Sequence, residues 1–208
     1  IAASPEARIG AASERLAIYA DLEDRLRALP GVTSATVASQ VPLLGASGRQ
    51  LSIEGQEAGP DSKPVTVDQV VTGDRYFETV GLSIVDGRSF NESDGLPGHE
   101  HVLVNQRFVD VHFPGLTAIG RRLQLSSPGA NPSPLWRTIV GVVPTIREWS
   151  SDDGNPIVYE PTRANPPGTA VVIVRVEHGE PSSVAPLIRE AVRELDANLP
   201  LYRVSQYA

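Results

Sequence analysis

The stretch GDRYFETVGL, residues 73–82, lies near the middle of the 208-residue chain and has the pattern of a short helix. Asp74 is a residue type that caps a helix N-terminus. Gly81 is the type that ends a helix, because glycine adopts the left-handed backbone conformation without steric cost. We therefore predict a helix over 74–80, followed by a short strand over 82–84.

The pair Gly87-Arg88 follows, and after it comes a loop that extends to Gly98. Such a pair can form an anion site, but after a strand it more often makes a turn and a structural ion pair. The carboxylates within reach along the chain are those of Asp74, Asp86 and Asp94. The sequence does not choose among these three partners.

Beyond this loop the pattern alternates between strands and one helix. Residues 102–104 predict a strand, and Asn105 is placed to cap a helix that carries Phe108, Val109 and Phe113. The Ser/Pro/Gly/Asn-rich stretch 126–134 and the polar stretch 150–155 predict loops. Between and after them we expect further strands over 121–125, 136–143 and 157–159.

Each end of the chain combines a helix with a strand. Near the start, leucines and a tyrosine recur at helical spacing over 11–29, Pro30-Gly31 ends the helix, and a strand follows over 32–38. Two half-buried strands then contain Leu51 with Ile53 and Val65 with Val67. The end of the chain predicts a strand over 170–176, a helix over 184–195 capped by Ser182 or Ser183, and a strand over 199–204. An internal repeat and a chance similarity both fit the two end units.

Short motifs with a fixed order run through the whole chain. They are LPGV (29–32), VPL (41–43), GDRYFETVGL (73–82), DGRSF (86–90) with Asp94, VNQRF (104–108), PG (114–115), IGRRL (119–123), IVGVV (139–143), VYEP (158–161), and LD (195–196) before LPL (199–201). Each motif is weak alone, but their order is specific. Together, over about residues 15–206, they resemble the MacB/FtsX-like periplasmic core domain of bacterial ABC transporter permeases, including the duplicated-permease type. One departure is Pro144-Thr145-Ile146-Arg147, where that family commonly has Gly-Asp.

The resemblance implies a bipartite α+β fold. A porter-like α/β sandwich subdomain is expected from residues 1–72 and 166–208, with a mixed, β-rich, Sabre-like subdomain inserted at 73–165. The implied function is that of an extracytoplasmic, periplasmic domain of a permease in the bacterial inner membrane, which relays ATP-driven motion to a periplasmic substrate or partner. The partners implied are its own transmembrane helices, an ATP-binding subunit, a second copy of the domain and a periplasmic protein.

Composition narrows the range of functions. Acidic residues outnumber basic ones by 25 to 18, and no cluster of Lys and Arg reverses that balance locally, which argues against nucleic acid as a partner. The absence of cysteine rules out disulfides and thiol chemistry. The sequence contains no methionine, no signal peptide and no apolar run of about 18–20 residues, so we expect a fragment of a longer protein whose membrane segments lie elsewhere.

Candidate chemical sites are few. His99 and His101 fall on one side of an extended segment, but no third metal ligand is indicated, and residues 91–95 lack the spacing of a calcium loop. We therefore expect no catalytic, cofactor or metal-binding residues, and no enzyme activity. Trp136 is expected in the core, whereas Trp149 in a polar loop is a candidate contact for a partner.

The sequence also raises two other classes of function. A free-standing periplasmic binding or adaptor module would have the same domain without flanking membrane helices, so the full-length gene product distinguishes it. An exported hydrolase would need a catalytic constellation, and the sequence has no nucleophile elbow or phosphate-binding loop.

Overall fold

Six strands from residues 47–161 pair edge to edge until the last meets the first. The structure, a computed structural model, describes residues 11–41, 47–56, 63–129, 135–146, 154–177 and 181–195. Within these residues the strands follow the order β2–β6–β7–β5–β8–β3, and β3 pairs again with β2. We call this assembly the closed sheet. Its strands are β2 (Ser47–Ile53), β3 (Val65–Thr72), β5 (His101–Asn105), β6 (Arg122–Ser126), β7 (Arg137–Val143) and β8 (Ile157–Pro161).

The interior of the closed sheet is an apolar core, because successive side chains of a strand point to opposite faces. All six strands contribute to it, among their residues Leu51, Val67, Val104, Leu123, Ile139 and Val158. Helix α3 (Gln106–His112) adds Phe108 to this core, with Phe113 just after it. As predicted, Asn105 caps α3, and its side-chain oxygen accepts a hydrogen bond from the Phe108 N–H at 3.0 Å.

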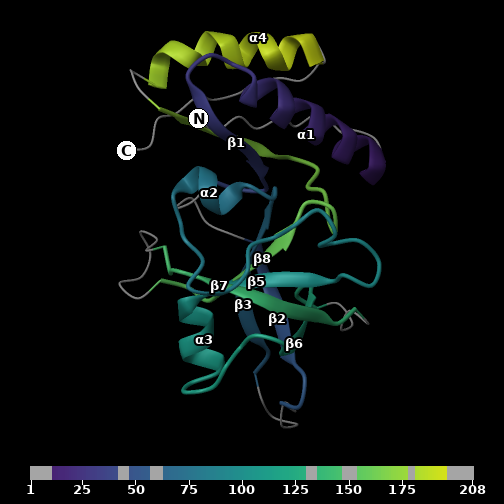
Figure 1. Cartoon of the computed structure of the whole chain (residues 1–208). Coiled ribbons are helices and arrows are strands. Elements are labelled where there is room, and N and C mark those ends of the chain that lie inside the picture. The colour runs from purple at the N-terminus through teal and green to yellow at the C-terminus, as the bar shows by residue number, and fades with distance from the viewer. Residues whose placement is uncertain are drawn as a thin grey trace.

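The two ends of the chain meet above the closed sheet and form what we call the terminal unit (Figure 1). It consists of α1 (Ala12–Arg27), β1 (Val32–Ala38), β9 (Val171–Val176), the short 3-10 helix Pro181–Val184 and α4 (Ala185–Leu195). Strand β1 pairs along its length with β9 and at Ala38↔Thr72 with β3. Leu22 and Leu26 of α1 and Ile188 of α4 are buried in one core with residues of β1 and β9.

Helix α2 (Tyr76–Val80) lies between the terminal unit and the closed sheet. Its aromatic residues belong to a third core, which also contains Leu103, Tyr159 and Val171. That core covers the outer face of the closed sheet, so several of its strands are buried on both faces. The tiny strand β4 (Asp86–Gly87) pairs with β7 beside it. Gly87 is required there, because its φ is +74° and an added Cβ would lie 2.2 Å from the Val140 carbonyl oxygen.

One predicted strand is wrong. Residues 82–84 form no strand, because the chain there still completes the end of α2: the Leu82 N–H donates to the Phe77 carbonyl oxygen at 2.8 Å. Ladder pairing with β7 begins only at Val85, whose N–H donates to the Val142 carbonyl oxygen. The predicted strand over 199–204 lies outside the described residues.

The expected division into two subdomains stays a prediction, but the packing bears on its boundary. Strands β2 and β3 share their core with β6, β7 and β8 rather than with α1 and α4. Residues 47–72 therefore pack with the inserted part of the chain, although the prediction grouped them with its ends. The reason is long-range pairing of β2 with β6 and of β3 with β8, which local sequence does not specify.

Candidate functional site at helix α2

One side of α2 is hydrogen-bonded to both strands of the terminal unit. The hydroxyl oxygens of Ser34 in β1 and Thr79 lie 2.7 Å apart, and Nε of Arg175 in β9 donates to the Thr79 carbonyl oxygen at 2.8 Å. The Thr79 hydroxyl donates to the Arg75 carbonyl oxygen at 2.7 Å. Since a hydroxyl has one proton, Ser34 is the donor to Thr79. These bonds fix α2 to the terminal unit.

The other side of α2 packs on the closed sheet through aromatic rings. The Phe77 ring meets Tyr159 of β8 edge to face with centroids 5.1 Å apart, and Phe90 lies 6.3 Å away. Tyr76 lies 6.0 Å from Tyr159 and is also buried. Contacts of this geometry add to the stabilisation that comes from burial itself. Helix α2 is thus anchored on both sides.

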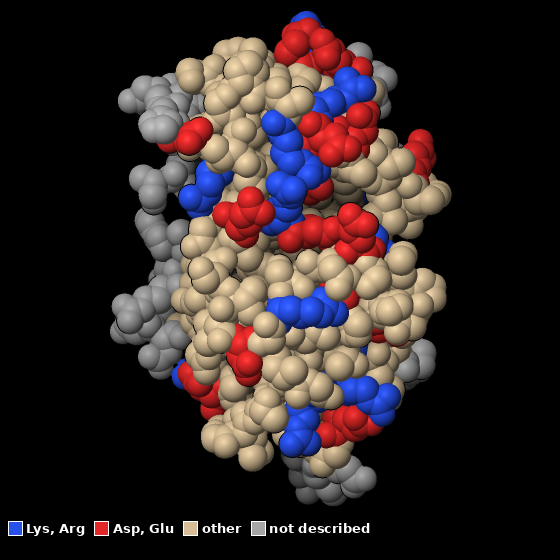
Figure 2. Space-filling model, in the orientation of Figure 1, with Lys and Arg blue, Asp and Glu red and all other residues tan. Residues whose placement is uncertain are grey.

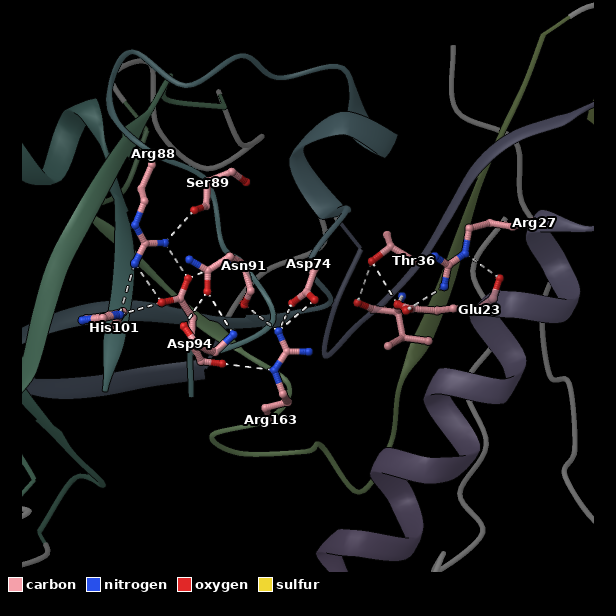
Figure 3. A network of polar contacts seen from close by, with 12 residues as sticks. Glu23, Arg27, Thr36, Asp74, Arg88, Ser89, Asn91, Asp94, His101 and Arg163 are labelled. Carbon is pink, nitrogen blue, oxygen red and sulfur yellow. Dashed lines mark hydrogen bonds and ion pairs between the residues drawn. The ribbon is translucent and has the colours of Figure 1, made fainter. Parts of the chain in front are cut away.

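Beneath α2, the buried carboxylate of Asp94 gathers four donors (Figure 3). Arg88 binds it with both terminal nitrogens, at 2.6 and 2.9 Å, and the Asn91 N–H donates at 2.8 Å. Nδ1 of His101 lies 2.5 Å from the same carboxylate. Because an ionised carboxylate only accepts, Nδ1 of His101 is the donor in this contact.

The surroundings of Asp94 decide its charge. Burial alone would raise the pKa of this carboxyl, but the hydrogen bonds from Arg88, Asn91 and His101 outweigh burial and lower the pKa from 3.8 to about 2. Asp94 is therefore ionised throughout the physiological range. Its charge holds the loop that contains Arg88 and Asn91 against β5.

Arg163, in the loop after β8, connects this loop to the start of α2. Its Nη2 lies 2.8 Å from both carboxylate oxygens of Asp74 and donates to the Asn91 carbonyl oxygen at 2.7 Å, while Nε donates to the Asp94 carbonyl oxygen at 3.2 Å (Figure 3). The same loop reaches α1, because the Tyr19 hydroxyl donates to the Pro167 carbonyl oxygen at 2.6 Å. This loop is a second connection between the two units.

Glu23 of α1 reaches towards the same region from the terminal unit. Its carboxylate accepts from the Val37 N–H at 2.9 Å and from the Thr36 hydroxyl at 3.3 Å. An added Cβ at Gly73 would lie 2.4 Å from it and 2.6 Å from the Thr36 hydroxyl, so a larger residue at 73 would displace the Glu23 side chain from these contacts. Burial raises the pKa of Glu23, and the neighbouring charge of Asp74 raises it further, against the opposing effect of the Val37 and Thr36 hydrogen bonds and of Arg27.

We call this set of contacts, from α2 through Asp94 and Arg163 to Glu23, the joint. The joint contains ion pairs, hydrogen-bonded carboxylates and packed rings, which hold α2 to both units. A surface depression of about 1050 Å³ opens beside it, lined by α2 and by residues 81–84 and 89–93. In the described part of the chain, no group of three or more His, Cys, Asp or Glu side chains is placed to hold a metal ion.

The structure chooses among the alternatives that the sequence left open for Arg88: its partner is Asp94. Asp74 does not cap α2, whose N-cap residue Arg75 makes no side-chain cap bond, and it pairs with Arg163 instead. Trp136 is not in the core; it is half-buried, with the Arg122 guanidinium 5.6 Å from its ring centroid. Trp149 lies outside the described residues, so its role as a partner contact stays a prediction.

Two residues of the joint were missed in the sequence. Glu23 lies four residues after Tyr19 and three before Leu26, both buried, so its helical spacing is a signal that could have revealed it. Arg163 has no such signal, because its partners are 69 and 89 residues away along the chain.

The family model of the MacB-like periplasmic core domain matches residues 3–191, and the chain belongs to that family. Its members are periplasmic domains of ABC transporter permeases rather than classical enzymes. Membership implies an extracytoplasmic location, membrane-spanning helices and an ATPase partner in the intact system. No helix among the described residues is long and apolar enough to cross a bilayer.

Solved structures share the fold. The periplasmic region of MacB from Actinobacillus actinomycetemcomitans is 16% identical with a TM-score of 0.57, and the match covers 85% of this chain and 73% of that one. The extracellular domain of the noncanonic ABC-type transporter YknZ from Gram-positive bacteria is 17% identical with a TM-score of 0.55, covering 86% and 82%. A domain of a permease protein from Porphyromonas gingivalis is 19% identical, with a TM-score of 0.52 and coverage of 81% and 73%. No curated protein matches the sequence.

Proposed function

We propose that this domain relays ATP-driven motion of a permease to a substrate or partner protein outside the membrane. The observation that supports this most directly is that α2 is bonded to both units: to β1 and β9 through Thr79, and to β8 through Phe77. Force applied to the terminal unit then moves the closed sheet with it. A relay needs such a stiff connection and needs no reactive group.

The surface in Figure 2 carries side chains of both charges. On the face in Figure 2, acidic and basic side chains lie interspersed over the terminal unit and its border with the closed sheet, while broader uncharged surface lies below. Mixed charges of this kind pair with one another. We propose that the partners are the transmembrane helices of the same permease, an ATP-binding subunit, a second copy of the domain and a periplasmic protein.

We further propose the bipartite organisation of the family for this chain, with the boundary adjusted to the packing. The terminal unit corresponds to the porter-like part. The closed sheet, including residues 47–72, corresponds to the inserted Sabre-like part.

The test uses the full-length permease with its ATP-binding subunit in lipid nanodiscs. The chain has no cysteine, so spin labels can be placed in it at Arg25→Cys on α1 and Asp110→Cys on α3. We expect ATP to change the distance between labels on the two copies and to leave the Arg25–Asp110 distance within one copy unchanged. Removing the joint contacts with Ser34→Ala and Thr79→Val should broaden the within-copy distribution. If ATP does not change the distances between the labels on the two copies, the relay is contradicted.

A further inference from the structure

One end of the closed sheet has a polar interior, in contrast to its apolar core. Side chains two residues apart on a strand point to the same face, so each apolar core residue indicates which neighbour also points inward. At this end of the sheet those inward neighbours are polar: Arg49 (beside Leu51), Gln69 (beside Val67), Arg137 (beside Ile139) and Glu160 (beside Val158). The register places them all at one end, because Ser47 pairs with Gln69, Gln50 with Ser126 and Val71 with Glu160. Helix α3, whose Phe108 fills the core, follows the opposite end of β5.

These side chains form a connected chain of hydrogen bonds. Glu160, whose side chain is 1% exposed, accepts from Arg137 Nε on one oxygen and from Gln69 on the other. The Gln69 side-chain oxygen accepts from Arg49 Nε at 2.6 Å, and Arg49 Nη1 donates to the Ser127 hydroxyl at 2.8 Å. Arg137 also donates to the Leu135 carbonyl oxygen at 3.3 Å. Each guanidinium therefore still has donors that these contacts do not use.

The charges in this cluster do not balance. Two guanidinium groups face one carboxylate, and Glu160 is already bound by Arg137 and Gln69. Arg49 makes bonds only to neutral oxygens, and it has no ion pair with any described carboxylate. An arginine held by neutral partners next to a second arginine retains the capacity to bind an anion in its planar fork.

A pocket opens over the cluster. It has a volume of about 180 Å³ and is lined by Arg49, Gln69, Leu125, Ser126, Ser127, Arg137 and Asn165, none of which is acidic. Sites for drug-sized ligands are roughly 300–1,000 Å³, so this pocket suits one small polar group instead. Open ends of closed sheets are common positions for ligand sites. Ser126, Ser127 and Asn165 add further neutral polar residues to its lining.

We propose that this pocket is a binding site for a single oxyanion group, a carboxylate or a phosphate. Arg49 and Arg137 bind it through their remaining N–H groups, while Ser126, Ser127 and Asn165 complete its hydrogen bonds. The group is either a free ion or the terminal carboxylate of a peptide, since both offer the same oxygens. Glu160 holds Arg137 in place beneath the ligand. The site does not depend on the proposed relay, because binding needs neither ATP nor the membrane.

The test is a titration of the 208-residue chain with inorganic phosphate and with acetate at constant ionic strength, balanced with chloride. Arginine Nε–Hε signals in ¹⁵N NMR spectra report the site directly. We expect saturable shifts of the Arg49 and Arg137 signals, and a loss of affinity of about 10- to 100-fold in Arg49→Gln, the scale of a lost charge-assisted hydrogen bond. The matched control is Arg193→Gln on α4, which removes one exposed positive charge elsewhere and should leave the affinity unchanged.

Further experiments distinguish a free ion from a peptide C-terminus as the ligand and control for misfolding of the variant. A short peptide with a free C-terminus that binds more tightly than acetate, while its amidated form does not bind, identifies a chain terminus as the ligand; equal affinities identify a free ion. If Arg49→Gln fails to fold, Arg49→Lys keeps the charge without the planar fork and should bind severalfold more weakly. Shifts that do not saturate, or that are equal in Arg49→Gln and Arg193→Gln, would overturn the proposal.

Discussion

The terminal unit and the closed sheet differ in where they place charged side chains. Among the described residues of the terminal unit, the partly buried Glu23 borders an apolar core, and ion pairs such as Arg25–Asp21 and Arg193–Glu190 lie on exposed helix surfaces. The closed sheet encloses Glu160 and Arg137 at one end, and Asp94 is buried beside it. Helices that cover one face of a strand pair leave their polar faces in water. Strands that close on themselves bring distant polar residues together, so buried charges find partners there.

The largest loss of stability is expected from truncating a buried leucine in either of the two cores. Leu26→Ala in the terminal unit and Leu123→Ala in the closed sheet each remove a side chain that is 0% exposed, and each should lower the free energy of unfolding by about 2–5 kcal/mol. Hydrogen exchange read by mass spectrometry should show faster exchange first in the unit that carries the substitution. Equal acceleration in both units would mean that they unfold as one.

A pair of glycines compares the two units at their turns. Gly31, between α1 and β1, has φ +80°, and a Cβ added there would meet no atom within 4 Å. Gly87 has φ +74°, and a Cβ added there would clash with the Val140 carbonyl oxygen. Gly31→Ala should cost about 1–2 kcal/mol for the left-handed backbone alone. Gly87→Ala adds a steric clash and should cost about 3 kcal/mol or more. Chemical denaturation measures both; similar values would show that β4 can move away from β7.

We expect low pH to lower the stability of the domain by protonating Asp94. Because its pKa is lowered to about 2 from 3.8, its contribution to stability is present above pH 3.8 and is lost as the pH falls towards 2. The loss should be about 2 kcal/mol. Asp94→Asn should be less stable than the wild type at pH 7, and the difference should shrink between pH 4 and 2. A constant difference over that range would show that the charge of Asp94 is not what stabilises the loop.

A smaller effect concerns the bond that joins α2 to the terminal unit. Ser34→Ala and Thr79→Val each remove a hydroxyl from the 2.7 Å pair, and each should cost about 1 kcal/mol. The double variant should cost less than the sum, with a coupling of about 0.5–1 kcal/mol, because both substitutions break the same bond. Strict additivity would mean that the two hydroxyls act independently.

The smallest effect has the opposite pH dependence. The pKa of Glu23 is raised mainly by burial, so its contribution is fully present below its ordinary value of 4.5 and is lost as the pH rises through the raised pKa. As the pH rises above this raised pKa, the terminal unit therefore loses that contribution. Glu23→Gln should raise stability at pH 7 by less than about 1 kcal/mol, and Asp24→Asn on the exposed side of the same helix serves as control. A loss of stability in Glu23→Gln would contradict this sign.

Local sequence was sufficient to predict most of the helices and strands and to indicate the family. The helical spacing of α1, the glycine that ends α2 and the Asn105 cap of α3 each act within one or two turns, so their residues predict them directly. The ordered motifs indicated the family, which the match over residues 3–191 confirmed. The strand predicted at 82–84 failed because the Leu82 N–H still completes the end of α2, a backbone hydrogen bond that the local sequence pattern did not reveal.

What only the tertiary structure decided is which distant residues meet. The pairing of β2 with both β3 and β6 closes the sheet, and the chain had offered no local sign of closure. Closure in turn brought Arg49, Arg137 and Glu160 to one end. Arg88 had three carboxylates within reach, and the fold chose Asp94 because the loop turns back under α2. Hydrophobic alternation specifies which side of a strand is buried, but the partner of a strand depends on the packing of the whole core.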